Sequence, residues 1–223
     1  MVVTFPGSNC DQDTVHVLEN VFGRSVSSVW HRERVLPKGT DLVILPGGFS
    51  YGDALRSGAL ARFSPIMASV RSFAEGGGFV MGICNGFQIL LEAGLLPGAM
   101  LQNDRRTFVC RLQRLRVESS ETPYTQSWPT GVELMLPIAH HEGRYFAPHE
   151  ELDRLESEGR IAFRYVGNPN GSSRDIAGLV SENRRVLGLM PHPERACETL
   201  LGSSDGLDLF SSLFNSIERT GSL

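Results

Sequence analysis

A cysteine between two glycines is the residue of this chain best suited to covalent chemistry. Cys84 lies in the run Gly82-Ile83-Cys84-Asn85-Gly86, after the apolar run 79–81 and before an apolar stretch with helical spacing. This order of strand, sharp turn and helix is that of the nucleophile elbow, with Cys in place of Ser. Glycines avoid clashes at such a turn, and a helix N-terminus favours a thiolate. The pattern predicts that Cys84 is a nucleophile.

A general base for this cysteine is predicted in the segment Pro191-His192-Pro193-Glu194. A residue before proline is kept out of the α-helical region, so the segment is expected to be extended. In an extended chain, positions two apart point the same way. Glu194 would then accept a hydrogen bond from one nitrogen of His192, and the other nitrogen would face Cys84. The sequence thus predicts a nucleophile, a base and an orienting carboxylate.

Two backbone segments are candidates for stabilising a negative oxygen in the reaction. The amide of Asn85 follows the nucleophile directly and points to where an oxyanion would form. The glycine-rich loop 46–53 follows the apolar run Leu42–Leu45 and exposes backbone N–H groups that could supply a second donor.

These segments are predicted to be positioned by a parallel sheet. Short, continuous apolar runs are typical of strands buried on both faces, and helical stretches lie between them. The alternation predicts an α/β fold with a doubly wound, mostly parallel sheet flanked by helices. The expected strands are 42–45, 79–81 and 186–190, and the expected helices are 12–21, 60–75, 85–93 and 207–217.

The middle of the chain, residues 105–180, is predicted to be an extra, strand-rich region. Phe108, Cys110 and Leu112 alternate with polar residues, and Leu115 and Val117 continue the alternation in the opposite phase. A β-bulge near residue 113 would explain that change of phase.

Composition excludes several classes of function. The 223 residues suffice for one large domain, predicted to span 1–223. A formal net charge of −4, from 21 basic and 25 acidic residues, gives no general attraction for nucleic acid. No apolar run is long enough for a membrane helix and no signal peptide is recognisable, so the cytoplasm is expected. The only lysine, Lys38, lies outside any phosphate loop, and the four cysteines have no metal-binding spacing.

The order of glycine-rich loop, cysteine elbow and His-x-Glu resembles that of the class I, or triad, glutamine amidotransferases. Within them, the chain is similar over nearly its whole length to the glutaminase subunits of phosphoribosylformylglycinamidine synthases of the small, separate-subunit type. The resemblance implies a flavodoxin-like fold. Besides the loop and the elbow, the stretches that carry it are 5–11, 137–140, 168–172, 175–178 and 190–196.

This resemblance implies a reaction and roles for named residues. Glutamine would be hydrolysed to glutamate and ammonia through a thioester on Cys84, with His192 and Glu194 as base and orienting group. The amides of Gly48 and Asn85 would form the oxyanion hole. Gln88, one helical turn beyond the nucleophile, would help to hold the substrate glutamine.

The resemblance also implies partners. Ammonia would pass to a large synthetase subunit that converts formylglycinamide ribonucleotide to formylglycinamidine ribonucleotide in de novo purine biosynthesis. A small third subunit would join the complex. ATP and magnesium are expected on the synthetase, and no cofactor or metal is expected on this chain.

Alternatives remain at this stage. The chain could serve another synthetase, or be another cysteine-elbow enzyme such as a γ-glutamyl hydrolase. A non-catalytic binding or stress-response protein of the superfamily is a third reading, although such proteins usually lack the downstream His-x-Glu. The roles of His140, His141 and Glu142 stay open between catalysis and the boundary with the synthetase, since relatives usually have glycine at position 141.

Overall fold

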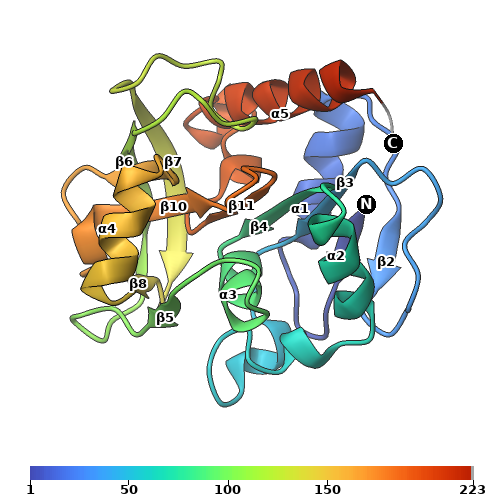
Figure 1. Ribbon diagram of the computed structural model, residues 1–223, viewed down its shortest axis with the longest axis horizontal. Coiled ribbons are helices and arrows are strands. Elements are labelled where there is room, and N and C mark those ends of the chain that lie inside the picture. The colour runs from blue at the N-terminus through green and yellow to red at the C-terminus, as the bar shows by residue number, and fades with distance from the viewer. Residues whose placement is uncertain (222–223) are drawn as a thin grey trace.

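One mixed sheet of nine strands runs through the molecule in the computed structural model, which describes residues 1–221 (Figure 1). One half of this sheet is parallel. The central strands of this parallel half are buried along their whole length, because helices cover both faces of the sheet there. In spatial order the parallel strands are β2 (Ser28–Trp30), β1 (Val2–Thr4), β3 (Leu42–Leu45), β4 (Phe79–Ile83) and β11 (Val186–Leu189).

The middle of the chain extends the same sheet with antiparallel strands. In spatial order these strands are β10 (Ile176–Val180), β9 (Ile161–Tyr165), β6 (Val109–Val117) and β7 (Glu133–His140). A separate two-stranded sheet pairs β5 (Ala99–Leu101) with β8 (Arg144–Phe146). The predicted α/β fold with an extra strand-rich region is therefore confirmed.

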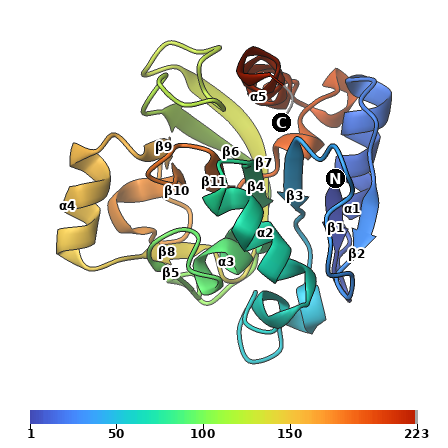
Figure 2. The same ribbon diagram turned by 45° about the vertical axis from the view of Figure 1, so that its right-hand side comes forward.

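Helices cover both faces of the parallel half (Figure 2). On one face, α3 contacts β3, β4 and β11, and α2 lies beside it against β4. On the other face lie α1 and α5, and Phe22, just after the helical turn that continues α1, packs against Phe210 and Phe214 of α5 at centroid distances of 5.8 and 5.2 Å. The α-helices are α1 (Asp11–His16), α2 (Ile66–Glu75), α3 (Asn85–Glu92), α4 (His149–Ser157) and α5 (Gly206–Thr220).

Short helical turns complete the described elements. A π-helical turn continues α1, so helical structure covers the predicted range 12–21. These turns are η1 (Val17–Val21), η2 (Ser50–Asp53), η3 (Ala61–Phe63), η4 (Ser173–Asp175), η5 (Pro193–Arg195) and η6 (Thr199–Leu201).

Three local predictions were wrong or incomplete. The helix expected over 60–75 is broken at Ser64, which is extended (ψ 138°) because it precedes Pro65. No bulge occurs in β6, which pairs with β7 in one continuous register. The apolar residues Phe108, Cys110 and Leu112 are exposed instead, and the buried phase of β6 continues through Gln113, which donates to the carbonyl of Val166. Helix α4 was not predicted, although Leu152 and Leu155, three apart, are its buried residues.

The turn between β4 and α3 depends on unusually close packing at glycine. Cys84 has φ 50° and ψ −104°, a conformation that is strained for a residue with a side chain. A Cβ on Gly86 would lie 1.9 Å from the carbonyl oxygen of Leu45, and one on Gly82 would lie 2.6 Å from the Gly86 carbonyl. The start of α3 therefore lies directly on the ends of two strands.

We expect Gly86→Ala to destabilise the protein by about 3 kcal/mol or more, because the added methyl meets backbone that cannot move aside. Gly94→Ala, just beyond the end of α3, is the matched control. Its Cβ meets nothing within 4 Å and only the positive φ of 68° opposes it, so we expect about 1 kcal/mol. Urea unfolding of both variants would measure the difference, and equal losses would contradict the packing argument.

Candidate active site

Three segments meet at the carboxyl edge of the parallel strands: the loop after β3, the elbow after β4 and the segment after β11. The elbow is tied to the end of the neighbouring strand, because the amide of Cys84 donates to the carbonyl of Leu189 at 2.8 Å. The predicted nucleophile and the predicted base thus follow adjacent parallel strands. The carboxyl edge of an open parallel sheet is where such folds place their sites.

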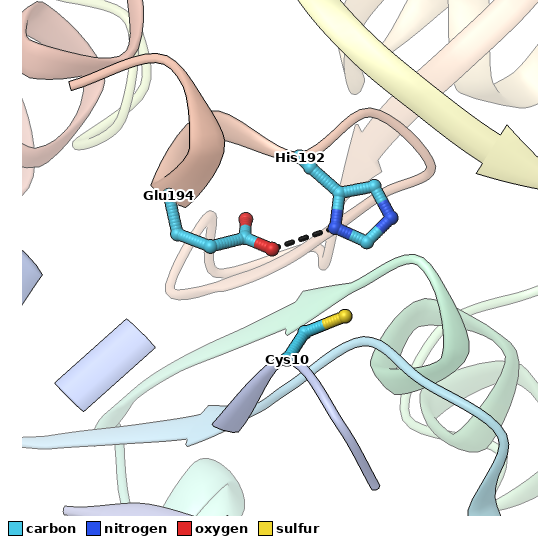
Figure 3. Close-up of side chains that lie close together, drawn as sticks. All are labelled: Cys10, His192 and Glu194. Carbon is cyan, nitrogen blue, oxygen red and sulfur yellow. Dashed lines mark hydrogen bonds and ion pairs between the residues drawn. The ribbon is translucent and has the colours of Figure 1, made fainter. Parts of the chain in front are cut away.

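His192 and Glu194 form a buried pair, as the spacing predicted. Nδ1 of the imidazole lies 2.6 Å from Oε1 of the carboxylate, and both side chains are almost completely buried (Figure 3). The amide of His192 donates to the carbonyl of Pro137 on β7 at 2.8 Å. A Cβ at Gly47 would lie 2.6 Å from Cε1 of the ring, so only glycine lets the loop after β3 come this close.

The surroundings of His192 favour its charged form. Burial alone would lower the pKa of the imidazole, but the Glu194 carboxylate and then the nearby Cys84 sulfur act against burial and raise the pKa well above 6.5. Within the described residues, Nε2 of His192 has no hydrogen-bond partner. The Cys84 sulfur lies 3.7 Å from the carbonyl oxygen of Ala139, a long contact on β7. Nε2 is therefore free for proton transfer.

The side chain of Asn85 ties the glycine-rich loop to the elbow. Its Oδ1 accepts from the amide of Ser50 at 3.2 Å, and its Nδ2 donates to Asp53 at 3.3 Å. In the described part of the chain, no hydrogen bond engages the amide of Asn85 or that of Gly48, whose φ is 126°. Both candidate oxyanion donors are thus free to bind an oxygen.

Gln88, the predicted substrate-binding residue, is buried beside the nucleophile and is already hydrogen-bonded. It accepts from Nδ2 of Asn85 at 3.0 Å and donates to the backbone carbonyl of Glu142. The carboxylate of Glu142 in turn accepts from the amide of Ser57 at 3.0 Å. Glu142, in the segment after β7, is therefore joined to Gln88 and to Ser57 in front of Cys84.

The cavity in front of Cys84 is consequently very small. Its accessible volume is about 10 Å³, which is close to the space of a single water molecule. Its walls are Gly48, Phe49, Asp53, Ser57, Cys84, Gln88, Ala139, His140, His141 and Glu142.

The sequence did not assign a role to the wall formed by β7 and the loop after it. His140 is buried, and its pKa falls to about 4 through burial and the charge of His192. Asp53 also lines the cavity, and burial raises the pKa of its carboxyl to about 6. A hydrogen bond to Ser57 lowers this pKa in part, and the charge of Glu142 raises it by a smaller amount. The glycine after Glu142 is a signal that could have pointed here, because a Cβ on Gly143 would lie 2.3 Å from Nδ1 of His140.

One group of side chains in the described residues brings three potential metal ligands together. Cys10, His192 and Glu194 offer donor atoms within 4.8 Å of one another (Figure 3). Several of their atoms make other contacts: Nδ1 of His192 pairs with Oε1 of Glu194, and Nη2 of Arg195 donates to the Cys10 sulfur at 3.0 Å. Arg195 is held in turn by Asp13 at 2.9 Å. Cys10 therefore belongs to the packing behind the His192–Glu194 pair.

Comparisons with known proteins agree with this geometry. A family model described as "CobB/CobQ-like glutamine amidotransferase domain" matches residues 1–206. The chain is 57% identical to phosphoribosylformylglycinamidine synthase subunit PurQ of Rubrobacter xylanophilus, covering 95% of this chain and 96% of that protein. Identity to PurQ of Thermus thermophilus is 55%, covering 98% of each chain.

Among solved structures, that of PurLQS from Thermotoga maritima matches this chain with a TM-score of 0.88 and 45% sequence identity, covering 96% of each chain. No helix of the described residues has the length and apolar character needed to cross a membrane.

We expect Glu194→Gln to lower the pKa of His192, because burial then acts without the opposing carboxylate charge. The imidazole signals of His192 would be followed by NMR as a function of pH. Glu198→Gln is the matched control, since Glu198 pairs with the exposed His16 at 3.0 Å and not with His192. An unchanged His192 titration in Glu194→Gln would show that the pair does not set the charge of the base.

Proposed function

Since the chain belongs to the family of CobB/CobQ-like glutamine amidotransferase domains, we propose that it hydrolyses glutamine and supplies the ammonia to a phosphoribosylformylglycinamidine synthase. The observation that carries this proposal is the buried His192–Glu194 pair beside Cys84, at the ends of adjacent parallel strands. The relatives reported above share one name, and no observation favours another synthetase or a γ-glutamyl hydrolase.

The first half of the reaction forms a thioester. The Cys84 sulfur, with its proton passed to His192, attacks the side-chain carbonyl carbon of glutamine, and a C–S bond forms. The carbonyl oxygen becomes an oxyanion that the amides of Gly48 and Asn85 stabilise. His192 then gives its proton to the nitrogen, the C–N bond breaks and ammonia leaves.

The second half of the reaction removes the acyl group. His192, now neutral, takes a proton from a water molecule, which attacks the thioester carbon. The C–S bond breaks, glutamate is released and the proton returns to the Cys84 sulfur. Glu194 keeps the imidazole in one orientation and stabilises its charged form in both halves. Gln88 contributes to holding the substrate once glutamine displaces its present contacts.

The partners follow from the same proposal. A large synthetase subunit would use the ammonia to convert formylglycinamide ribonucleotide to formylglycinamidine ribonucleotide, and a small third subunit would complete the complex. ATP and magnesium would bind to the synthetase and no cofactor to this chain. We place this activity in the cytoplasm. We also propose that residues 1–223 form a single domain, because the nine-stranded sheet and one hydrophobic core continue through the described residues.

The closed cavity supports a link between partner binding and activity. A space for about one water molecule does not admit glutamine, so the loop with Ser57 and the segment with Glu142 must move apart first. Docking of the synthetase against these walls would supply the energy for opening. The isolated chain is then a weak glutaminase, which prevents loss of ammonia when no acceptor is bound.

We expect Cys84→Ala to lower glutamine-dependent product formation by the assembled complex by roughly 10³-fold or more. Activity with added ammonium salt should be unchanged, because the thiol serves only to cleave glutamine. Product formation with each nitrogen source would be measured side by side. Cys110→Ser is the matched control, since Cys110 is exposed and lies outside the site.

If Cys84→Ala abolished both activities in a complex that still assembles, the proposed division of labour would be wrong. If it retained glutamine-dependent activity, Cys84 would not be the nucleophile.

We also expect a glutamine-like electrophile to modify Cys84 before Cys10, Cys110 or Cys197, because among the four cysteines only Cys84 combines a nearby base with a place on the wall of the cavity. The synthetase subunit should accelerate this labelling by about tenfold or more, since reactivity scales with the fraction of open sites. Peptide mass spectrometry would give the rates, with iodoacetamide labelling of exposed Cys110 as the control. Equal labelling of all four thiols, or no acceleration, would contradict this account.

A further inference from the structure

A second buried histidine lines the same cavity as Cys84, and the reaction described above does not use it. His140 is the last residue of β7, is 3% exposed and forms part of the wall of the cavity in front of Cys84. Its Nε2 is completely buried and has no hydrogen-bond partner within the described residues. A buried polar atom without a partner costs free energy, so a bound group that satisfies it would be stabilised.

The hydrogen bonds around His140 determine which of its nitrogens carries the proton. Asn103 donates from Nδ2 to the backbone carbonyls of Thr107 and His140, at 2.8 and 3.0 Å. Its Oδ1 accepts from the amide of Gly143 at 3.0 Å. Because these backbone partners have fixed polarity, the carboxamide has only one consistent orientation.

In that orientation, Oδ1 of Asn103 lies 3.1 Å from Nδ1 of His140 and acts as an acceptor. Nδ1 must therefore carry the proton, and Nε2 of the neutral ring presents a lone pair. The pKa of about 4, lowered by burial and by the charge of His192, keeps the ring neutral near pH 7. Nε2 is thus a hydrogen-bond acceptor and not a donor.

The position of this ring is rigidly supported. Asn170 donates to the carbonyl of Gly143 at 2.7 Å, and the Ser172 hydroxyl accepts from the amide of Tyr145 at 3.0 Å. These contacts fix the turn after β7 on which the ring packs, and they come from the stretch 168–172 that no catalytic role explains. The ring that forms part of the cavity wall is therefore held in place, and its Nε2 is left without a partner.

We propose that Nε2 of His140 accepts a hydrogen bond from the side-chain NH₂ group of glutamine and thereby distinguishes the substrate from glutamate. This proposal rests on the proposed function. The amide of glutamine has two N–H donors, whereas the carboxylate of glutamate has none and would place a charged oxygen against a lone pair. A site that presents an unpaired acceptor rejects an analogue that lacks the donor. The same contact would hold glutamine for attack and favour release of the product glutamate.

His140→Asn in the assembled complex tests this proposal. Asparagine can still donate to Asn103 from the position of Nδ1, but it has no atom at the position of Nε2. We expect the KM for glutamine to rise roughly 10- to 100-fold, as for the loss of one hydrogen bond in a buried site. The inhibition constant of glutamate should stay the same or fall, and ammonia-dependent activity should be unchanged. His140→Gln, whose Oε1 reaches the Nε2 position, should recover part of the loss.

A structural role alone would give a different result. If His140→Asn only disturbed the turn after β7, binding of glutamine and of glutamate would weaken together and His140→Gln would not rescue it. Either that result or an unchanged KM would overturn the proposal. A wild-type complex without glutaminase activity would instead overturn the proposed function, whatever the behaviour of the His140 variants.

Discussion

The close approach of helix α3 to the sheet is the constraint on which the rest of the site depends. Three glycines allow it: Gly86 against the carbonyl of Leu45, Gly82 against the start of the helix, and Gly188 against the ring of Phe87. Any side chain at these positions would push the helix away from the strands. Cys84 would then leave the carboxyl edge of the sheet, where the segment after β11 carries His192.

Two imidazoles in this small volume have opposite charge preferences because their neighbours differ. His192 has a carboxylate at 2.6 Å, and this neighbour raises its pKa against the effect of burial. His140 is hydrogen-bonded to the neutral carboxamide of Asn103, so no carboxylate opposes burial. Burial and the charge of His192 therefore lower the pKa of His140 to about 4. One ring is therefore suited to move protons and the other to accept a hydrogen bond. Pairs of titratable groups driven apart in this way usually mark a division of chemical roles.

Strand β7 brings the second imidazole to the site. β7 is the last strand in the nine-stranded order, so one of its edges pairs with no other strand of that sheet. This edge contacts the segment after β11, because the carbonyl of Pro137 on β7 accepts a hydrogen bond from the amide of His192. A proline is tolerated there because its missing N–H is on an edge strand. The antiparallel half of the sheet is therefore part of the site. The segment that follows β7 also closes the cavity, because Glu142 accepts a hydrogen bond from the amide of Ser57.

Local stereochemistry made the turn at Cys84, the pairing of His192 with Glu194 and the central strands predictable. The glycines around Cys84 and the prolines around His192 restrict the backbone within a few residues, and strand β3 was predicted with its observed bounds because its burial on both faces leaves a continuous apolar run. The placement of His140 could not be predicted, because Asn103, which sets its tautomer, is 37 residues away. The closed cavity and the inward Gln113 likewise depend on contacts between distant segments. The sequence alone was enough to nominate Cys84, His192 and Glu194 as candidates for catalysis. The charge of each imidazole and the size of the cavity follow from the tertiary structure, because burial and long-range hydrogen bonds set both.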